Sequence, residues 1–445
     1  MRNPIPPATV RRAVSAVARS GQPRERSRPR VLSNMWRVLA VIGPGIIVAN
    51  AGNDAGGIFT YSNIGAKYGV TLLWTFIPTT IALIFTQEMV ARLGCVTGKG
   101  LMALIRERFG VRWTLFAAVV VLLANGGTTL AEFAGVAGAL GLLGVPRAVS
   151  VIAAAALIMV VVLRGNRRLV ERVFLALGLV FFSYVITAFT VHPNWGSIGH
   201  SLATPSISEP GVAPTAILVD VIALVGTSIT PYMQLYLQSS IVDKGTPERD
   251  LNFVRLDVIS GSLFAMTVAG FIVVTTAATL HLHGLAGVGV SSAADAAGAL
   301  RPLVGIHAEQ LFAVGLMGAS LLAAAVLPLS TAFVVCEAFG AEASVQRRFR
   351  EAPLFFTLFI GLLVIGAGVM LIPAVPIAGV AIGTQTIDGV LLPVLLVFVI
   401  LLANDRRLLG ERRNRPVVNA IALALAGVMS VLSISLVVIT LLPSS

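Results

Sequence analysis

Runs of about 20 consecutive apolar residues recur from Val38 to the C-terminus, and they constrain this chain more than any other feature. A helix rising 1.5 Å per residue needs about 20 residues to cross a hydrocarbon core ~30 Å thick. Lipid offers no partner for the open backbone of a loop or sheet edge, so such runs must be helical. Apolar residues make up 56% of the 445 positions and charged residues only 12%. The sequence therefore predicts an all-α integral membrane protein.

The apolar runs mark eleven spans with short loops between them. Closely spaced helices of this kind indicate one bundle, although the length alone would suggest two or three soluble domains. The predicted spans are about 39–63, 70–91, 114–143, 148–163, 169–191, 213–238, 256–280, 308–338, 354–372, 377–402 and 417–442.

The net charge of +12 could suggest a nucleic-acid partner, but the positions of the basic residues argue against one. Of the 32 lysines and arginines, 29 lie in the N-terminal arm or in the loops after spans 2, 4, 6, 8 and 10. The other three are Lys67, Arg147 and Arg301. This alternation is typical of the positive-inside rule and predicts a cytoplasmic N-terminus and an external C-terminus. We expect a multi-pass protein of an inner or plasma membrane, with the lipid bilayer as its surroundings and no nucleic-acid partner.

Residues 1–37 form a basic, proline-containing arm without an apolar core. We expect it to be disordered, with contact to anionic lipid as the alternative to a simple solvated tail. Cys95 and Cys336 imply no disulfide framework. No cofactor is expected, and a monomer is compatible with the sequence.

Acidic residues inside predicted spans point to function, because a charge at mid-membrane costs several kcal/mol. The candidates are Asp54, Glu132, Asp220 and Asp388. Asp54 is the strongest, since it stands in Gly-Asn-Asp-Ala-Gly-Gly at 52–57, midway through an otherwise apolar span. Three glycines in six residues weaken a helix by nearly ~1 kcal/mol each. We infer a broken helix whose free carbonyls and carboxylate form a hard-oxygen cation site, with close helix packing around a protonated Asp54 as the alternative.

A second interruption is predicted in span 6, at residues 226–234. Pro231 removes a helical hydrogen bond, and neighbouring threonines and a serine can satisfy the freed backbone. Breaks in spans 1 and 6 are what two inverted repeats of five spans would place face to face at the membrane midplane.

Several motifs along residues 37–415 resemble the NRAMP (natural-resistance-associated macrophage protein) family of divalent-metal transporters. They are Gly43-Pro44-Gly45, Asp54-Ala55-Gly56-Gly57, Gly65-Ala66-Lys67-Tyr68-Gly69, Ala91-Arg92-Leu93-Gly94, Leu130-Ala131-Glu132, Leu235-Tyr236-Leu237-Gln238-Ser239, Gln385, Leu392-Pro393 and Asp405-Arg406-Arg407-Leu408. The resemblance implies a LeuT-like fold with an eleventh helix added. Its parts would be the arm (1–37), a first repeat (38–191), an outer loop (192–212), a second repeat (213–403), and a cytoplasmic loop with the eleventh helix (404–445).

Two departures from the family pattern bear on which metal is carried. Members that carry manganese and iron have asparagine where this chain has Gly57, and methionine where matching the prolines puts Thr230. Matching the downstream block instead puts Pro231 at the methionine and Met233 at the first histidine. The resemblance then implies a metal site of Asp54, Gly57, Thr230 and Gln385. Without a soft thioether, such a site suits hydrated Mg²⁺, as in the NRAMP-related magnesium transporters, and tolerates Mn²⁺.

Proton coupling is predicted to be lost. The resemblance puts Thr129 at the position of a span 3 aspartate, and Tyr232 and Gln238 at the positions of span 6 histidines. None of the three can carry a proton near neutral pH. Glu132 remains, either as part of a proton path or as a structural acid. Asp220 could attract dications to an outer vestibule or be a plain interfacial acid, and Asp388 could support the site or be structural.

The function predicted is therefore transport of divalent cations by alternating access, with Mg²⁺ favoured and no proton coupling. The alternatives are a proton-coupled Mn²⁺/Fe²⁺ symporter of the same family and a sodium-coupled symporter of organic solutes on a LeuT-like scaffold. An intramembrane enzyme is disfavoured, because the chain has neither a His-Glu-x-x-His nor a Gly-x-Ser-x-Gly motif.

Overall fold

The computed structural model describes residues 53–164, 182–207, 210–341 and 349–441. The chain divides into two units, residues 1–41 and 42–445, and every described residue belongs to the second. The predicted basic arm and the first part of span 1 lie outside the described residues, as does most of span 5.

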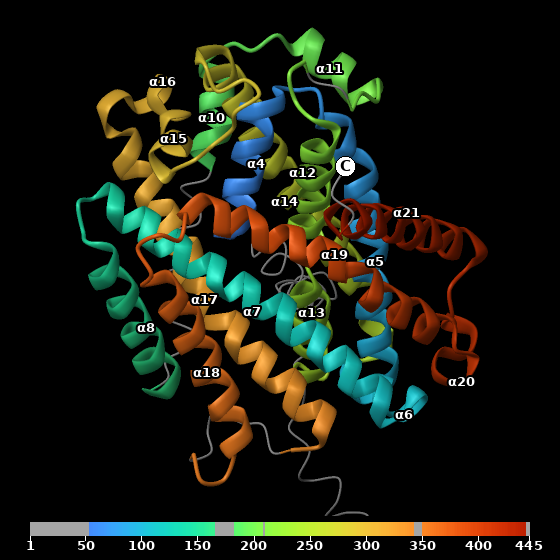
Figure 1. Cartoon of the computed structure of the whole chain (residues 1–445). Coiled ribbons are helices and arrows are strands. Elements are labelled where there is room, and N and C mark those ends of the chain that lie inside the picture. Colours follow the sequence, from blue (N-terminus) through green and yellow to red (C-terminus); the bar gives the residue numbers. More distant parts are fainter. Residues whose placement is uncertain (1–52, 165–181, 208–209, 342–348, 442–445) are drawn as a thin grey trace, which may run out of the picture. The chain divides into compact units, whose positions relative to one another are not determined.

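The described part of the chain is helical (Figure 1). Its longer helices are α4 (Ala55–Tyr68), α5 (Phe76–Thr97), α7 (Val111–Leu142), α8 (Arg147–Arg164), α12 (Pro214–Ser228), α13 (Pro231–Asp243), α14 (Leu251–Thr279), α17 (Ala308–Phe339), α18 (Pro353–Met370), α19 (Ile377–Asn404) and α21 (Pro416–Leu441). Shorter helices are α6 (Leu101–Phe109), α10 (Phe182–Thr190), α11 (Trp195–Ala203), α15 (Ala293–Gly298), α16 (Arg301–Val304) and α20 (Arg406–Leu409).

Spans 2, 3 and 6–11 are confirmed as eight segments long and apolar enough to cross a bilayer, with α12 and α13 together forming span 6. Span 4 corresponds to a shorter apolar helix, Arg147–Val162. The predicted end of span 2 near residue 91 was wrong, because α5 continues to Thr97. Arg92 can remain in the helix since its guanidinium donates to the Arg412 carbonyl (2.6 Å) and to Asn414 (2.5 Å) and pairs with Glu88 (3.2 Å).

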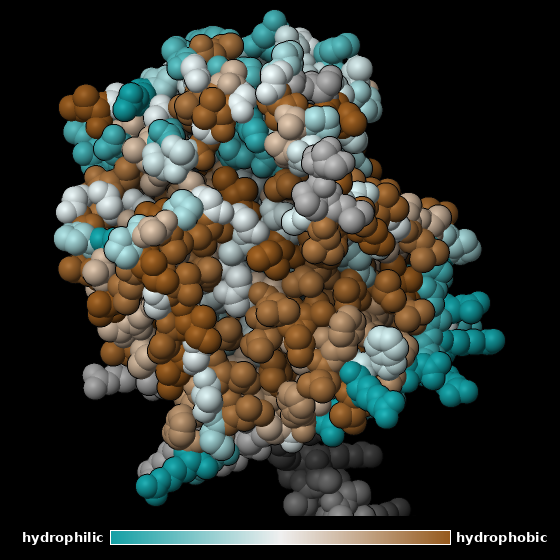
Figure 2. All heavy atoms as spheres, viewed as in Figure 1, coloured by the Kyte–Doolittle hydropathy of each residue, from teal (hydrophilic) through white to brown (hydrophobic). Residues whose placement is uncertain are grey.

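Figure 2 shows a broad apolar band across one face, with hydrophilic residues gathered above and below it. The segments that the charge pattern assigns to the cytoplasm contact one another, as expected if they lie on the same side of the apolar band. Gln238 donates to the Lys99 carbonyl at 2.8 Å, which joins the chain after span 2 to span 6. Arg108 pairs with Asp405 at 2.6 Å, which joins the loops after spans 2 and 10. These inner segments therefore meet at one end of the bundle.

The loops predicted to be external contact one another in the same way. The amide of Gly287 donates to the Lys67 carbonyl at 3.0 Å, and Arg147 donates to the Met370 carbonyl at 2.6 Å. Two of the three exceptional basic residues thus take part in structural contacts at the outer end. A multi-pass membrane protein with alternating loop positions accounts for both sets of contacts.

Close helix contacts are made through small residues, as is common in membrane bundles. The long helices α7 and α17 pack side by side, and α19 packs on both α7 and α12 (Figure 1). A very close backbone approach joins α12 to α19, where a Cβ atom at Gly226 would lie 2.1 Å from the Gln385 carbonyl oxygen and 2.4 Å from the Gly389 nitrogen. Glycine is required at position 226 because the two backbones touch.

Candidate metal-binding site

Span 6 is interrupted where the sequence predicted. Helix α12 ends at Ser228, Ile229 and Thr230 are not helical, and α13 begins at Pro231. The last carbonyls of a helix have no partner within it, and the end carries partial negative charge. Inside a membrane such a break is tolerated where it is buried in protein or lines a polar cavity, and it favours a cation.

The carboxylate of Asp54 caps the N-terminus of α4. Its Oδ1 accepts a hydrogen bond from the Gly57 amide at 2.7 Å, while Oδ2 is buried and has no hydrogen-bond partner in the structure. An acidic N-cap is stabilised by the free amides and the positive end of the helix dipole. Asp54, which is only 2% exposed, thus keeps one oxygen available for a ligand. Gly57 contributes its backbone N–H to Asp54, and the described contacts give it no role as a ligand of its own.

Glu132 lies beside Asp54, on the long helix α7. Its Oε2 accepts the Ala55 amide at 3.3 Å, and its Oε1 is buried without a partner. The charges of the two carboxylates are close enough to interact. From the sequence, Glu132 could belong to a proton path or be a structural acid. Its position beside Asp54 is compatible with both roles.

Gln385 of α19 packs over the first turn of α4. A Cβ atom at Gly56 would lie 2.0 Å from Gln385 Nε2, so only glycine allows this approach. The Oε1 atom of Gln385 is unpartnered, as is the buried Oγ1 of Thr230 at the span 6 break. Gly226 of α12, four residues before Thr230, lies against the backbone of Gln385, which places the break in span 6 near Gln385.

Asp388 is a third buried acid near this point. Its Oδ2 accepts the hydroxyl of Thr128 at 2.7 Å, its Oδ1 has no partner, and its charge interacts with that of Asp54. We call the set Asp54, Glu132, Thr230, Gln385 and Asp388 the central polar cluster. Each member has a buried oxygen without a hydrogen-bond partner, which in a native structure indicates a bound water or ion.

The central polar cluster offers carboxylate, amide and hydroxyl oxygens. No group of three or more His, Cys, Asp or Glu side chains close enough to hold a metal occurs among the residues that the structure describes. A cation here would therefore be bound mainly through neutral oxygens with one or two carboxylates, a donor set typical of Mg²⁺, Ca²⁺ and Mn²⁺. Arg92 is the only buried basic residue in the described ranges, and it pairs with Glu88 near the cytoplasmic end.

Sequence reasoning missed one further polar residue. Gln234 is 1% exposed and neither side-chain polar atom has a partner. It lies one helical turn after Thr230, so the i, i+4 spacing could have indicated it.

The three residues that the resemblance puts at proton-carrying positions are neutral and largely engaged. Thr129 donates to the Asn125 carbonyl at 2.7 Å, and Gln238 donates to the Lys99 carbonyl. Tyr232 is buried near the acids. The local environment therefore gives none of them an evident proton partner.

Asp220, the predicted vestibule acid, lies near the middle of α12, away from the central polar cluster. Its carboxylate pairs with Lys67 of α4 at 2.9 Å. Its negative charge is therefore compensated in this arrangement.

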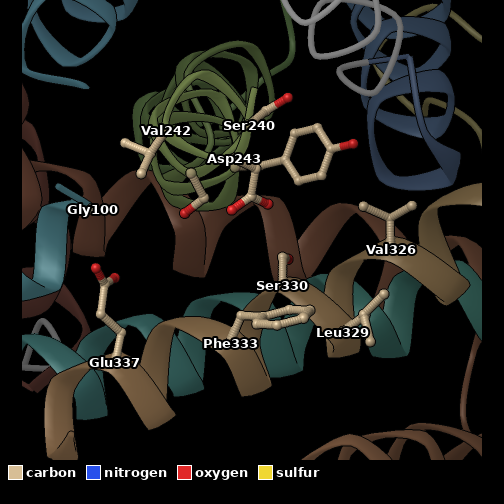
Figure 3. Close-up of a pocket in the computed structure, with 11 residues that line it drawn as sticks. Gly100, Ser240, Val242, Asp243, Val326, Leu329, Ser330, Phe333 and Glu337 are labelled. Atoms are coloured by element: carbon tan, nitrogen blue, oxygen red, sulfur yellow. The ribbon is translucent and has the colours of Figure 1, made fainter. Parts of the chain in front are cut away.

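At the end of the bundle that the charge pattern predicts to be cytoplasmic, a cavity of ≈ 190 Å³ lies between α13 and α17 (Figure 3). Its oxygen-bearing walls include Ser240 and Asp243 of α13, and Ser330 and Glu337 of α17. Figure 3 shows Glu337 directed toward Gly100, with Asp243 on the opposite wall. The Asp220–Lys67 pair lies nearer the opposite, predicted external end, where it joins α4 to α12.

Comparisons with known proteins agree with this fold. Residues 45–439 match the family described as natural resistance-associated macrophage protein-like. A relative from Ralstonia nicotianae named "Divalent metal cation transporter MntH" is 30% identical over 428 residues, which cover 91% of this chain and 92% of the relative. Another with the same name, from Erwinia tasmaniensis, is 32% identical over 304 residues, covering 65% of this chain and 70% of the relative.

Among solved structures, a manganese transporter from Eremococcus coleocola has a TM-score of 0.72 at 20% identity, covering 95% of this chain and 91% of that one. The transporter MhsT, crystallised with L-phenylalanine, has a TM-score of 0.55 at 14% identity, covering 88% and 97%. These likenesses show the fold of NRAMP and LeuT-type transporters, and the protein is a transporter rather than an enzyme. With most of its length matching the family, this chain belongs to the natural resistance-associated macrophage protein (NRAMP) family.

Proposed function

We propose that this protein carries divalent metal cations across the membrane, binding them at the central polar cluster. The observation that carries the proposal is the free, buried Oδ2 of Asp54 at the start of α4. It accompanies unpartnered oxygens of Thr230 and Gln385 near the break in span 6. A buried carboxylate offsets part of the cost of desolvating a dication, and the neutral oxygens replace lost water.

Manganese is the substrate that the comparisons favour. Relatives are named divalent metal cation transporters, and the structural neighbour is named a manganese transporter. Mn²⁺ is compatible with carboxylate, amide and hydroxyl ligands. The preference for Mg²⁺ that the sequence suggested finds no support in these names.

Magnesium remains a second candidate because of one specific feature, the donor set. Thr230 supplies a hydroxyl where the resemblance implies a thioether in manganese and iron carriers, and the central polar cluster contains no sulfur. A site without a soft ligand has little means of rejecting Mg²⁺ in favour of Mn²⁺. We therefore expect both ions to be carried, with Ca²⁺ poorer because it prefers six to eight ligands at longer distances.

Proton coupling is proposed to be absent, because Thr129, Tyr232 and Gln238 cannot titrate near neutral pH. The competing possibility is a proton-coupled symporter that uses Glu132 or Asp388, both of which retain an unpartnered oxygen. The predicted setting is a bacterial inner membrane, with the N-terminus inside and the C-terminus outside. Alternating access would arise from two five-span repeats, 38–191 and 213–403.

Uptake into proteoliposomes tests the proposal directly. Purified protein is compared for Mn²⁺, Mg²⁺ and Ca²⁺ uptake with a metal-sensitive dye inside. Asp54→Asn keeps the side-chain shape but removes the charge, so uptake should fall at least roughly tenfold while the protein still folds. Glu309→Gln, the same kind of change at the start of α17 and outside the cluster, is the matched control.

Normal uptake by well-folded Asp54→Asn would end the proposal. Uptake of an amino acid with Na⁺, and of no divalent metal, would instead support the organic-solute symporter.

A further inference from the structure

At the outer end of the bundle, the carboxylate of Asp220 is surrounded by donors from α4. Its Oδ2 accepts the Lys67 ammonium at 2.9 Å and the Tyr68 hydroxyl at 2.6 Å, and its Oδ1 accepts the Asn63 amide at 3.3 Å. Asp220 is on α12, so the cluster joins the first helix to the sixth span. We call these four residues the outer cluster.

The outer cluster contains its own cation. The Lys67 side chain is 15% exposed, and its ammonium also lies 5.2 Å from the centre of the Tyr68 ring. A lysine at this depth can turn its ammonium into water while its apolar stem stays buried. Asp220, at 8% side-chain exposure, has no such freedom and would keep a buried charge without a counter-ion.

The outer cluster lies between the outside and the break in span 6. Asp220 is eight residues before the end of α12 at Ser228, which is roughly 12 Å along a helix. Below it, the Tyr61 hydroxyl contacts the Ser228 hydroxyl at 3.1 Å, joining α4 to α12 again. A cation entering from outside along these two helices must pass the Asp220–Lys67 pair before it reaches Thr230.

The outer cluster also holds in place the loop around residues 287–290, between α14 and α17. Asn63 Oδ1 accepts the Val290 amide at 3.1 Å, and the Lys67 carbonyl accepts the Gly287 amide at 3.0 Å. The bond to Lys67 uses its backbone carbonyl and is independent of where the ammonium points, whereas movement of the Asn63 side chain away from Asp220 would loosen this loop. Asn63 contacts both Asp220 and this loop. Replacement of Lys67 by another cation at Asp220 is therefore linked to opening of the outer end.

We infer that Asp220, with the Tyr68 hydroxyl beside it, forms an outer binding position for the divalent cation, and that the Lys67 ammonium fills this position while the outer end is closed. The inference rests on the proposed function. A dication attracts the carboxylate twice as strongly as a monovalent ammonium at the same distance, so it can displace Lys67 into water. The cation and Lys67 compete for one carboxylate, and its arrival frees the contacts that hold the outer end closed.

Uptake kinetics test the competition. Lys67→Met removes the competing charge and should lower the KM for Mn²⁺ roughly tenfold, equivalent to about 1.4 kcal/mol. Lys67→Arg keeps the charge and should leave KM near the wild-type value. Asp220→Asn should raise KM, and adding Lys67→Met to it should have no further effect. Lys99→Met is the matched control, because Lys99 forms an exposed pair with Glu107 at the cytoplasmic end.

Thiol labelling tests whether Lys67 keeps the outer end of the bundle closed, and it does not depend on a transport assay. Cys95 and Cys336 are both buried and are first replaced by alanine. The thiol introduced by Ser228→Cys is then labelled from outside, in intact cells, with a membrane-impermeant reagent. Lys67→Met should speed labelling roughly tenfold, since about 1.4 kcal/mol of closure is lost, while Lys99→Met should not.

The outcomes separate this inference from the proposed function. Lack of divalent uptake by the wild-type protein would refute the proposed function, and the labelling result would still report on closure. If Asp220→Asn is labelled faster but keeps the wild-type KM, the outer binding position is overturned. The Asp220–Lys67 pair would then only hold the outer end closed. Equal labelling rates for Lys67→Met and Lys99→Met would overturn the role of Lys67.

Discussion

Replacing Gly226 by alanine should separate α12 from α19 and displace the metal site. The added Cβ would lie 2.1 Å from the Gln385 carbonyl oxygen, 2.4 Å from the Gly389 nitrogen and 2.8 Å from its Cα. All three atoms belong to the backbone, so no side-chain rotation can relieve the overlap. Reaching an ordinary contact requires the helices to part by roughly 1 Å.

The expected change in stability of Gly226→Ala follows from two opposing effects. Overpacking costs about 1–3 kcal/mol, and more where the backbone must move. Alanine otherwise favours a helix over glycine by up to ~1 kcal/mol. The displaced atom is the carbonyl of Gln385 itself, and a shift of ~1 Å in a positioning group can lower a rate by ~100-fold. We therefore expect Gly226→Ala to lose both stability and uptake.

Gly383→Ala is the matched control on the facing helix α19, two residues before Gln385. A Cβ at Gly383 would meet no atom within 4 Å, so the change should be neutral or stabilising. Apparent unfolding temperature in detergent and Mn²⁺ uptake in proteoliposomes are measured for both variants. If Gly226→Ala is as stable and as active as Gly383→Ala, the backbone contact between α12 and α19 is not part of the functional structure.

Three further predictions concern the central polar cluster. Thr230→Met with Gly57→Asn should shift preference toward Mn²⁺ because a soft donor is added; an unchanged Mg²⁺-to-Mn²⁺ uptake ratio would refute the ligand assignment. Asp388→Asn should fold, since its amide oxygen can still accept the Thr128 hydroxyl, but should lower uptake roughly tenfold because the amide nitrogen cannot replace the unpartnered Oδ1 as a metal ligand, and full uptake would make Asp388 structural. In liposomes holding a pH dye, metal uptake should leave the internal pH unchanged; acidification that follows metal concentration and disappears in Asp54→Asn would show proton symport.

The sequence predicted the helices and the span 6 break because these depend on local properties. Apolar runs of the right length and a proline after a Thr/Ser cluster are visible without knowing any neighbour. The end of α5 was mispredicted because Arg92 is paired with groups more than 300 residues away.

The candidate site was predictable in part. Asp54 and Gln385 were expected, and the structure brings Gln385 against the first turn of α4. The capping of α4 by Asp54 could not be read from a glycine-rich stretch that suggested only a loss of helix. The pairing of Asp220 with Lys67 joins residues 153 positions apart, and it depends on how two apolar helices are rotated, which uniform hydrophobicity does not encode.

The scarcity of buried basic residues has an electrical consequence. In the part of the chain that the structure describes, Arg92 is the only one, and it is paired with Glu88. When Asp54 is ionised and Glu132 and Asp388 are protonated, the empty site carries one negative charge and the loaded site one positive charge. A membrane potential that is negative inside then drives the loaded site inward and the empty site outward. At 100 mV each movement gains about 2.3 kcal/mol, so one cycle gains about 4.6 kcal/mol, enough for roughly a two-thousand-fold accumulation of metal powered by voltage alone.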